Sequence, residues 1–180
     1  MAGDGAAVAG SGRVRATRRR TLWSYRPGAT DYLLSAGCLA MLAAMSLAVW
    51  RGREQLAALP FTYPLHFGTL AIALALTPIL LLRAKGDKYH RYMGYVWLSA
   101  MVVTAVDTFF IRDINAGGFS LIHLLSVFVL FVSWRIWATA RAGNHVAHRR
   151  HVHGVVLGGL LIAGFFTFMF NRLFAQWIAL

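Results

Sequence analysis

Five apolar stretches dominate this chain, and each is long enough for a helix that crosses a membrane. A helix needs about 20 apolar residues to span a hydrocarbon layer about 30 Å thick. Only 13% of the 180 residues are charged, whereas a soluble domain has about a quarter. The sequence therefore predicts an all-α integral membrane protein with five transmembrane helices. The expected spans are Tyr32–Trp50, Phe61–Leu82, Tyr92–Ile111, Gly118–Ala140 and Val152–Asn171.

The segments around these spans indicate how the chain is organised. Residues 1–31 are rich in Gly, Ala and Arg and are expected to form a disordered basic arm on the cytoplasmic side. Residues 32–50 are expected to form a first anchor helix, and residues 61–174 a four-helix membrane domain. The single cysteine, Cys38, excludes an internal disulfide and a cysteine-rich zinc site. Any metal must therefore be held by other side chains.

Positive charge is distributed unequally between the two sides of the predicted bundle. Of the 18 Lys and Arg residues, 14 precede the first span, lie in the connections on its starting side or lie at the end of the fourth span on that side. By the positive-inside rule, this predicts a multi-pass protein of the bacterial inner membrane, with its amino terminus inside and its carboxyl terminus outside. The net charge of +12 indicates anionic lipid headgroups as partners of the basic arm, and no nucleic acid.

Histidine is uncommon inside bilayers, yet four of the seven histidines recur here at matching depths. His66 and His123 each lie five residues into their spans from the outside, which is roughly 7 to 8 Å at about 1.5 Å per residue. His90 and His148 open the next spans from the inside, each followed by Arg, and His151 is an alternative to His148. This regular spacing predicts that the last four helices form a bundle of two repeated helical hairpins.

The predicted repeat places histidines opposite one another. Two hairpins related by an axis along the membrane normal put His66 opposite His123, and His90 opposite His148 or His151. Paired imidazoles are the axial ligands of haem iron in electron transfer, and bundles hold cofactors between facing helices. We therefore predict one or two haem b groups held by these histidines. Copper or zinc bound directly by imidazoles is an alternative.

One carboxylate, Asp107, lies within a predicted span, about a turn from its outer end. An ionisable group at such a position needs a partner or a function. Arg172 has a suitable depth at the end of the fifth span, so a structural ion pair between Asp107 and Arg172 is favoured. The alternative is that Asp107 exchanges protons with a quinol or another reductant at the level of His66 and His123.

Short motifs surround these histidines. They are His66-Phe67-Gly68, Lys88-Tyr89-His90-Arg91-Tyr92-Met93-Gly94-Tyr95, Ile122-His123-Leu124-Leu125, Ala147-His148-Arg149-Arg150 and Asn171-Arg172-Leu173. Together they resemble a bacterial family of uncharacterised predicted four-helix membrane proteins, described as a domain of unknown function. The resemblance covers roughly Phe61 to Phe174 and favours His148 over His151. It implies no activity.

More distantly, histidines on four consecutive helices resemble the two-haem membrane cytochromes b of the ascorbate-reducible type. In that family the first ligand helix pairs with the third and the second with the fourth, which implies His66 with His123 and His90 with His148. Asp87 and Asn144 as N-caps would start two of the helices earlier than the apolar stretches do. The inner histidines would then lie within helix.

The expected function is electron transfer by a b-type haem membrane protein, and any enzyme activity would be that of a transmembrane oxidoreductase. An alternative of another class is a non-catalytic accessory or scaffold subunit of a larger respiratory or photosynthetic membrane complex. In that case the histidines would bond only to helices or lipids. A proton-coupled carrier that uses Asp107 and His66 is a third interpretation.

Overall fold

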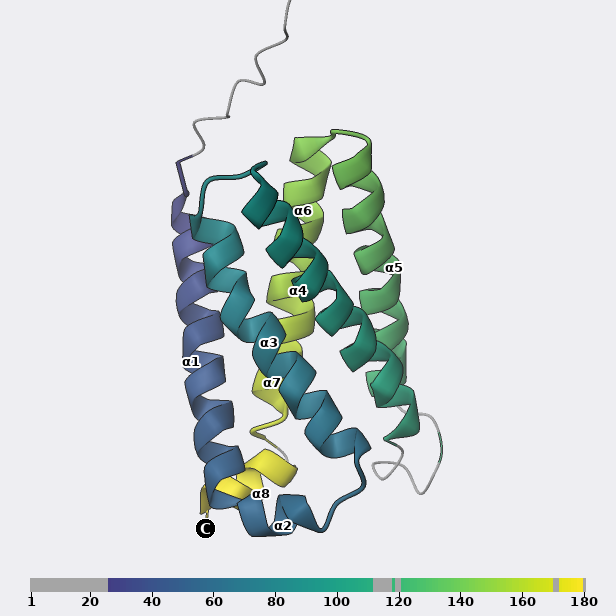
Figure 1. Ribbon diagram of the computed structural model, residues 1–180. Helices are drawn as coiled ribbons and strands as arrows, with labels where there is room; N and C mark the ends of the chain where they lie inside the picture. The colour runs from purple at the N-terminus through teal and green to yellow at the C-terminus, as the bar shows by residue number, and fades with distance from the viewer. Residues whose placement is uncertain (1–25, 112–117, 119–120, 170–171, 180) are drawn as a thin grey trace, which may run out of the picture.

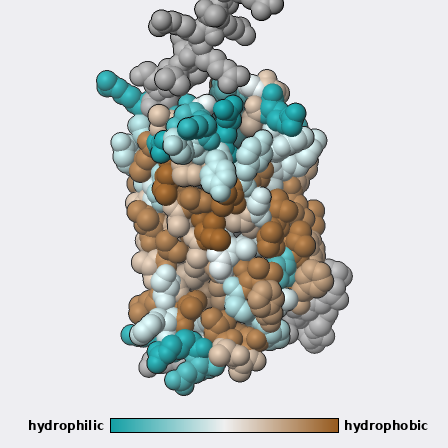
Figure 2. Space-filling view, in the orientation of Figure 1, coloured by the Kyte–Doolittle hydropathy of each residue, from teal (hydrophilic) through white to brown (hydrophobic). Residues whose placement is uncertain are grey.

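A computed structural model describes residues 26–111, 118, 121–169 and 172–179. Helices are the only regular structure in these residues, and four of them are long and apolar enough to cross a membrane. These four are α1 (Ala29–Arg51), α3 (Thr62–Leu82), α4 (Lys88–Asp107) and α5 (Leu121–Arg141). Hydrophobic residues form a belt between two more hydrophilic ends (Figure 2). The prediction of an all-α protein with membrane-spanning helices is confirmed for these four, and most of the predicted basic arm, up to residue 25, lies outside the described residues.

The fifth expected span is helical but is not one regular α-helix. It begins as α6 (His145–Val155), continues as the π-helix η3 (Val156–Ile162) and ends as α7 (Ala163–Phe166). The helical run starts two turns before the predicted span, because its first turns are polar. Since the π segment interrupts the run, neither α-helix here has the length of a span. The predicted end at Asn171 lies outside the described residues.

α4 and α6 begin in the same way. Gly86 and Gly143 precede them with φ angles of 91° and 70°, a conformation that glycine adopts without steric cost. The next residues, Asp87 and Asn144, cap the helices by accepting a hydrogen bond from the backbone N–H three residues on, at 2.6 Å and 3.0 Å. Both predicted N-caps are therefore confirmed, and the two inner histidines lie in the opening turns of these helices.

The Asp87 cap predicts a pH-dependent stability. Bonds from the backbone N–H of His90 and from the Arg83 side chain hold the pKa of Asp87 below its ordinary value of 3.8. A carboxylate with a lowered pKa stabilises the fold above the unfolded pKa, and this stability is lost as the pH falls through the folded pKa. We expect Asp87→Ala to lower the melting temperature at pH 6, and the difference from wild type to shrink below pH 4. An equal difference at pH 6 and pH 3, measured by thermal unfolding in detergent, would contradict this.

The long helices form a closed ring (Figure 1). α1 packs on α3, α3 on α4, α4 on α5 and α5 on α6, and the π segment returns to α1. α4 therefore lies between α3 and α5, and α5 lies between α4 and α6. The first helix, expected as a separate anchor, contributes the buried side chains of Leu34, Cys38 and Ala48 to the core. It is thus an integral part of the bundle.

The two ends of the bundle differ in composition. The basic end contains the start of α1 and the α3–α4 and α5–α6 connections, with Arg83, Lys85, Arg141, Arg149 and Arg150. At the opposite, capped end, the short helices α2 (Arg53–Ala57) and α8 (Leu173–Ala179) lie close together (Figure 1). Trp177 of α8 is fully buried against Gly52, and its indole Nε1–H donates to the side-chain oxygen of Gln55.

Candidate functional site

A histidine and a carboxylate face each other near the capped end. His66 lies in the second turn of α3, and Asp107 is the last residue of α4. His66 Nδ1 is 3.6 Å from Asp107 Oδ2, and the two side chains are 19% and 5% exposed. Asp107 therefore approaches His66, and the expected ion pair with Arg172 does not form between these two described residues. The reason is that the helical run ends at Phe166, so that Arg172 is exposed beyond it.

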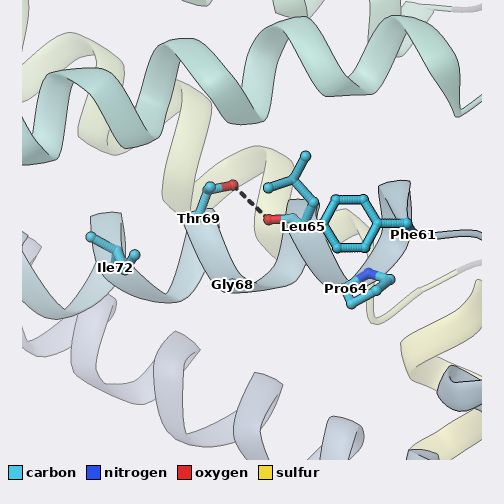
Figure 3. Close-up of a pocket in the computed structure, with 6 residues that line it drawn as sticks. All are labelled: Phe61, Pro64, Leu65, Gly68, Thr69 and Ile72. Carbon is cyan, nitrogen blue, oxygen red and sulfur yellow. Dashed lines mark hydrogen bonds between the residues drawn. The ribbon is translucent and has the colours of Figure 1, made fainter.

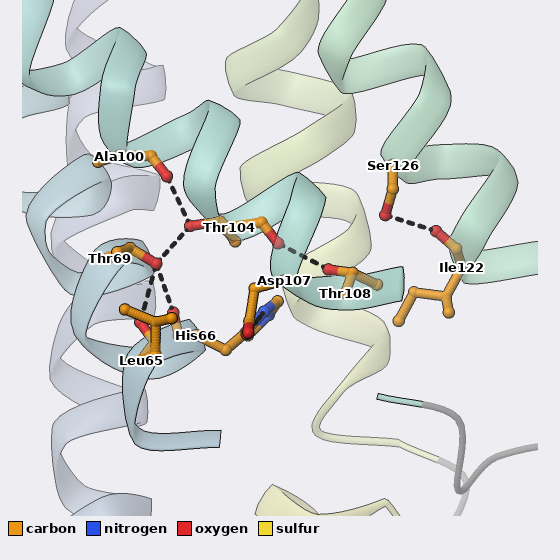
Figure 4. Close-up of polar contacts among 9 residues, drawn as sticks. All are labelled: Leu65, His66, Thr69, Ala100, Thr104, Asp107, Thr108, Ile122 and Ser126. Atoms are coloured by element: carbon orange, nitrogen blue, oxygen red, sulfur yellow. Dashed lines mark hydrogen bonds and ion pairs between the residues drawn. The ribbon is translucent and has the colours of Figure 1, made fainter. Parts of the chain in front are cut away.

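Three threonine hydroxyls surround this pair but are engaged elsewhere (Figure 4). The hydroxyls of Thr69 and Thr104 share a hydrogen bond, with their oxygens 2.7 Å apart. Each hydroxyl also lies within hydrogen-bonding distance of a backbone carbonyl in its own helix. Thr108 donates to the carbonyl oxygen of Thr104. Neither His66 Nδ1 nor Asp107 Oδ2 makes a hydrogen bond, although both atoms are buried. The imidazole and the carboxylate are thus left facing one another.

The other outer histidine, His123, lies in the first turn of α5 and is 4% exposed. Its ring packs against Phe109, with the ring centroids 5.8 Å apart. Phe109 belongs to the 3-10 turn η1 (Thr108–Phe110) that follows α4. Both predicted outer histidines therefore meet the same end of α4, one from α3 and one from α5.

Both predicted inner histidines lie at the basic end, His90 in the first turn of α4 and His148 in the first turn of α6. His148 lies close enough to His90 for their charges to interact. His148 Nδ1 is 3.1 Å from the carbonyl oxygen of Ile136. Because a carbonyl can only accept, Nδ1 must carry the proton, and Nε2 keeps the lone pair that binds a metal. The Nδ1 atom of His90 is buried and makes no hydrogen bond.

A buried ion cluster joins the first helix to α6, and we call it the Asp31 cluster (Asp31, Arg149 and His153). Asp31 is fully buried, and its carboxylate accepts from Arg149 Nη2 and from His153 Nε2, each at 2.9 Å. The backbone N–H of Gly28 donates to it as well. The sequence reasoning missed this cluster. The available signal was an acid in the first turn of an apolar helix, in a chain with only six acidic residues.

Lys85 adds positive charge beside the inner histidines. Burial lowers the pKa of the Lys85 ammonium group, which the Asp31 charge opposes and the Arg149 charge reinforces. The charge of Lys85 acts on both His90 and His148. His151, the alternative to His148, is half-buried in α6. The inner level is therefore an electropositive environment.

A shallow apolar groove lies on α3 (Figure 3). Its lining residues are Phe61, Pro64, Leu65, Gly68, Thr69 and Ile72. Thr69 has the one polar side chain among them, and that hydroxyl already donates to the carbonyl of Leu65. The groove thus suits an apolar chain such as a lipid tail.

Within the described residues, no three His, Cys, Asp or Glu side chains come together as metal ligands. Zinc usually takes three or four protein ligands, whereas iron in a porphyrin takes two. Comparison of the chain with protein families, curated proteins and solved structures finds no match. The histidines are therefore the residues from which a function can be inferred.

Proposed function

We propose that this chain is a five-span membrane protein that binds b-type haem between histidines of alternate helices and transfers electrons across the bilayer. The ligand pairs would be His66 with His123 at the outer level and His90 with His148 at the inner level. In this arrangement α3–α4 and α5–α6 are two repeated hairpins, and α6, η3 and α7 together form the fifth span.

The observation that carries the proposal is the orientation of the imidazole rings at the two levels. The His148 ring has its Nδ1 at a backbone carbonyl, and the His66 ring has its Nδ1 toward a carboxylate. Histidines that bind metals direct their second ring nitrogen at such acceptors, which fixes the tautomer and turns Nε2 to the metal. At the inner level a carbonyl therefore supports the His148 tautomer that leaves Nε2 for a metal, and at the outer level Asp107 lies beside His66 Nδ1 at 3.6 Å without a hydrogen bond.

The surroundings of the histidines support the same assignment. A Cβ added at Gly94, one turn after His90, would meet no atom within 4 Å, whereas one added at Gly159 would lie 3.2 Å from Val129. The surface of α4 one turn after His90 is thus open, whereas the packing along η3 is uneven, since a Cβ at Gly158 would also meet no atom within 4 Å. Haem iron with two imidazole ligands supplies one-electron chemistry without an open coordination position. The residues of the chain would hold the group, orient it and set its environment.

The charge distribution supports an orientation for the proposed electron path. The basic end carries most of the described Lys and Arg residues, so the positive-inside rule places it in the cytoplasm. The amino terminus would then lie on the cytoplasmic side of the inner membrane, and the capped end on the opposite side. The basic residues at the inner end would also lie at the level of anionic lipid headgroups.

The test is a reduced-minus-oxidised absorption spectrum of the purified chain in mild detergent, with a pyridine haemochrome assay to count haem. We expect a low-spin b-type spectrum with up to two haems per chain. His123→Ala and His148→Ala should each remove one of two components, about half of the haem. His145→Ala is the matched control, because His145 lies on α6 as well but is exposed, and it should keep the full spectrum.

Two results would overturn the proposal. One is a folded wild-type protein without haem even when haem is supplied during expression. The other is an unchanged spectrum in both His123→Ala and His148→Ala. Either result, with a stoichiometric protein partner in the purified sample, would favour the accessory-subunit interpretation.

A further inference from the structure

We infer that Asp107 is a positioning residue for His66 and that it makes the outer site lower in redox potential than the inner site. This inference rests on the proposed function. It concerns the difference in redox potential between the outer and inner sites when both bind the same cofactor.

Asp107 is buried at the end of α4. Its side chain is 5% exposed, and its Oδ2 atom makes no hydrogen bond. The neighbouring hydroxyls of Thr104 and Thr108 donate to carbonyls of their own helix. Placing a carboxylate there is costly unless a charged or hydrogen-bonding group compensates it. His66 Nδ1, at 3.6 Å, is the ion-pairing group that the described residues offer.

A carboxylate next to an imidazole ligand changes the electron density that the ligand donates. A carboxylate at Nδ1 holds the proton on that nitrogen and raises the basicity of the ring, so that Nε2 donates more electron density to a metal. A more basic ligand and a nearby negative charge favour the oxidised iron over the reduced iron. Asp107 would therefore lower the potential of the outer site.

The inner level has the opposite electrostatics. The acceptor at His148 Nδ1 is a neutral carbonyl, that of Ile136. Basic side chains gather at this end, with Arg83 and Lys85 in the α3–α4 connection and Arg149 in α6, and positive charge favours the state that carries one more electron. The two levels are thus unequal in charge, with a carboxylate beside the outer histidine and cationic side chains at the inner end.

The experiment is a potentiometric titration of wild type, Asp107→Asn and Asp107→Glu, followed by haem absorption. Glu54→Gln is the control, because Glu54 lies in α2 at the same end but is exposed. We expect wild type to show two components and Asp107→Asn to raise the lower potential. The shift should be at least tenfold in the ratio of reduced to oxidised haem, or about 59 mV for one electron. The upper component and Glu54→Gln should match wild type.

Different failures separate this inference from the proposed function. Wild type without haem overturns both. Haem-loaded Asp107→Asn with two unchanged potentials overturns the inference alone, and so does an equal shift of both components. If Asp107→Asn does not fold, Asp107→Glu decides, because displacing the carboxylate by one methylene should still move the lower potential and an unmoved value contradicts the inference.

Discussion

Replacing Asp31 by alanine is expected to lower the free energy of unfolding by about 3 kcal/mol, the lower end of the range for breaking a buried ion pair. Asp31 is fully buried, and its removal leaves Arg149 and His153 without the carboxylate to which both donate. The Arg149 side chain is 40% exposed, so that water can partly hydrate it. This is why the lower end of the range applies.

The measurement is equilibrium unfolding in detergent of wild type and Asp31→Ala. Asp87→Ala is a matched control, since Asp87 also lies at the start of a helix at the basic end but is partly exposed. Its effect should be clearly smaller. A double-mutant cycle with Arg149→Ala should give a coupling energy, because the two residues are in direct contact. Equal stability of wild type and Asp31→Ala would show that the Asp31 cluster does not hold α1 to α6.

The second large effect is expected at Gly52, where α1 meets α8. A Cβ placed on Gly52 would overlap the indole ring of Trp177, and that ring is fully buried. Overpacking of this kind costs about 1–3 kcal/mol. We expect Gly52→Val to reach about 3 kcal/mol and to separate α8 from α2.

Two further variants test this reason. Gly68→Ala adds a methyl group where no atom lies within 4 Å. Because alanine favours a helix interior over glycine, that change should be neutral or stabilising by up to about 1 kcal/mol. Gly52→Val should cost less when added to Trp177→Ala than when added to wild type, because the ring that it would meet is then absent. Limited proteolysis near the carboxyl-terminal helix reports its detachment, and a Gly52→Val protein as resistant as wild type would contradict the prediction.

The sequence predicts the helices well where a segment is apolar along its whole length. Four of the expected spans match long helices, and the caps at Asp87 and Asn144 follow from local side-chain chemistry. α6 starts at His145, before the predicted start of the span at Val152. Hydropathy predicts only the apolar part of a helix, whereas this helix extends into polar residues before it. The π segment also has no signal in hydropathy.

The candidate site was harder to predict because its decisive contacts join distant residues. The choice of His66 over Arg172 as the partner of Asp107 depends on where the last helical run ends. The Asp31 cluster links residues 118 positions apart or more. Trp177 follows the last expected span and is fully buried, because its indole bonds to Gln55, 122 positions earlier in the chain.

The closed ring also has a consequence for biosynthesis. α1 is held at one end by Arg149 and at the other by Trp177, and both lie more than 100 residues later in the chain. Helices are synthesised in the order of the chain, so these contacts to α1 can form only after α6 and α8 have been made. Contacts of such long sequence separation form slowly. The Asp31 carboxylate would therefore gain its bonds to Arg149 and His153 only late in synthesis, and α1 takes its final place in the bundle after every other long helix has been made.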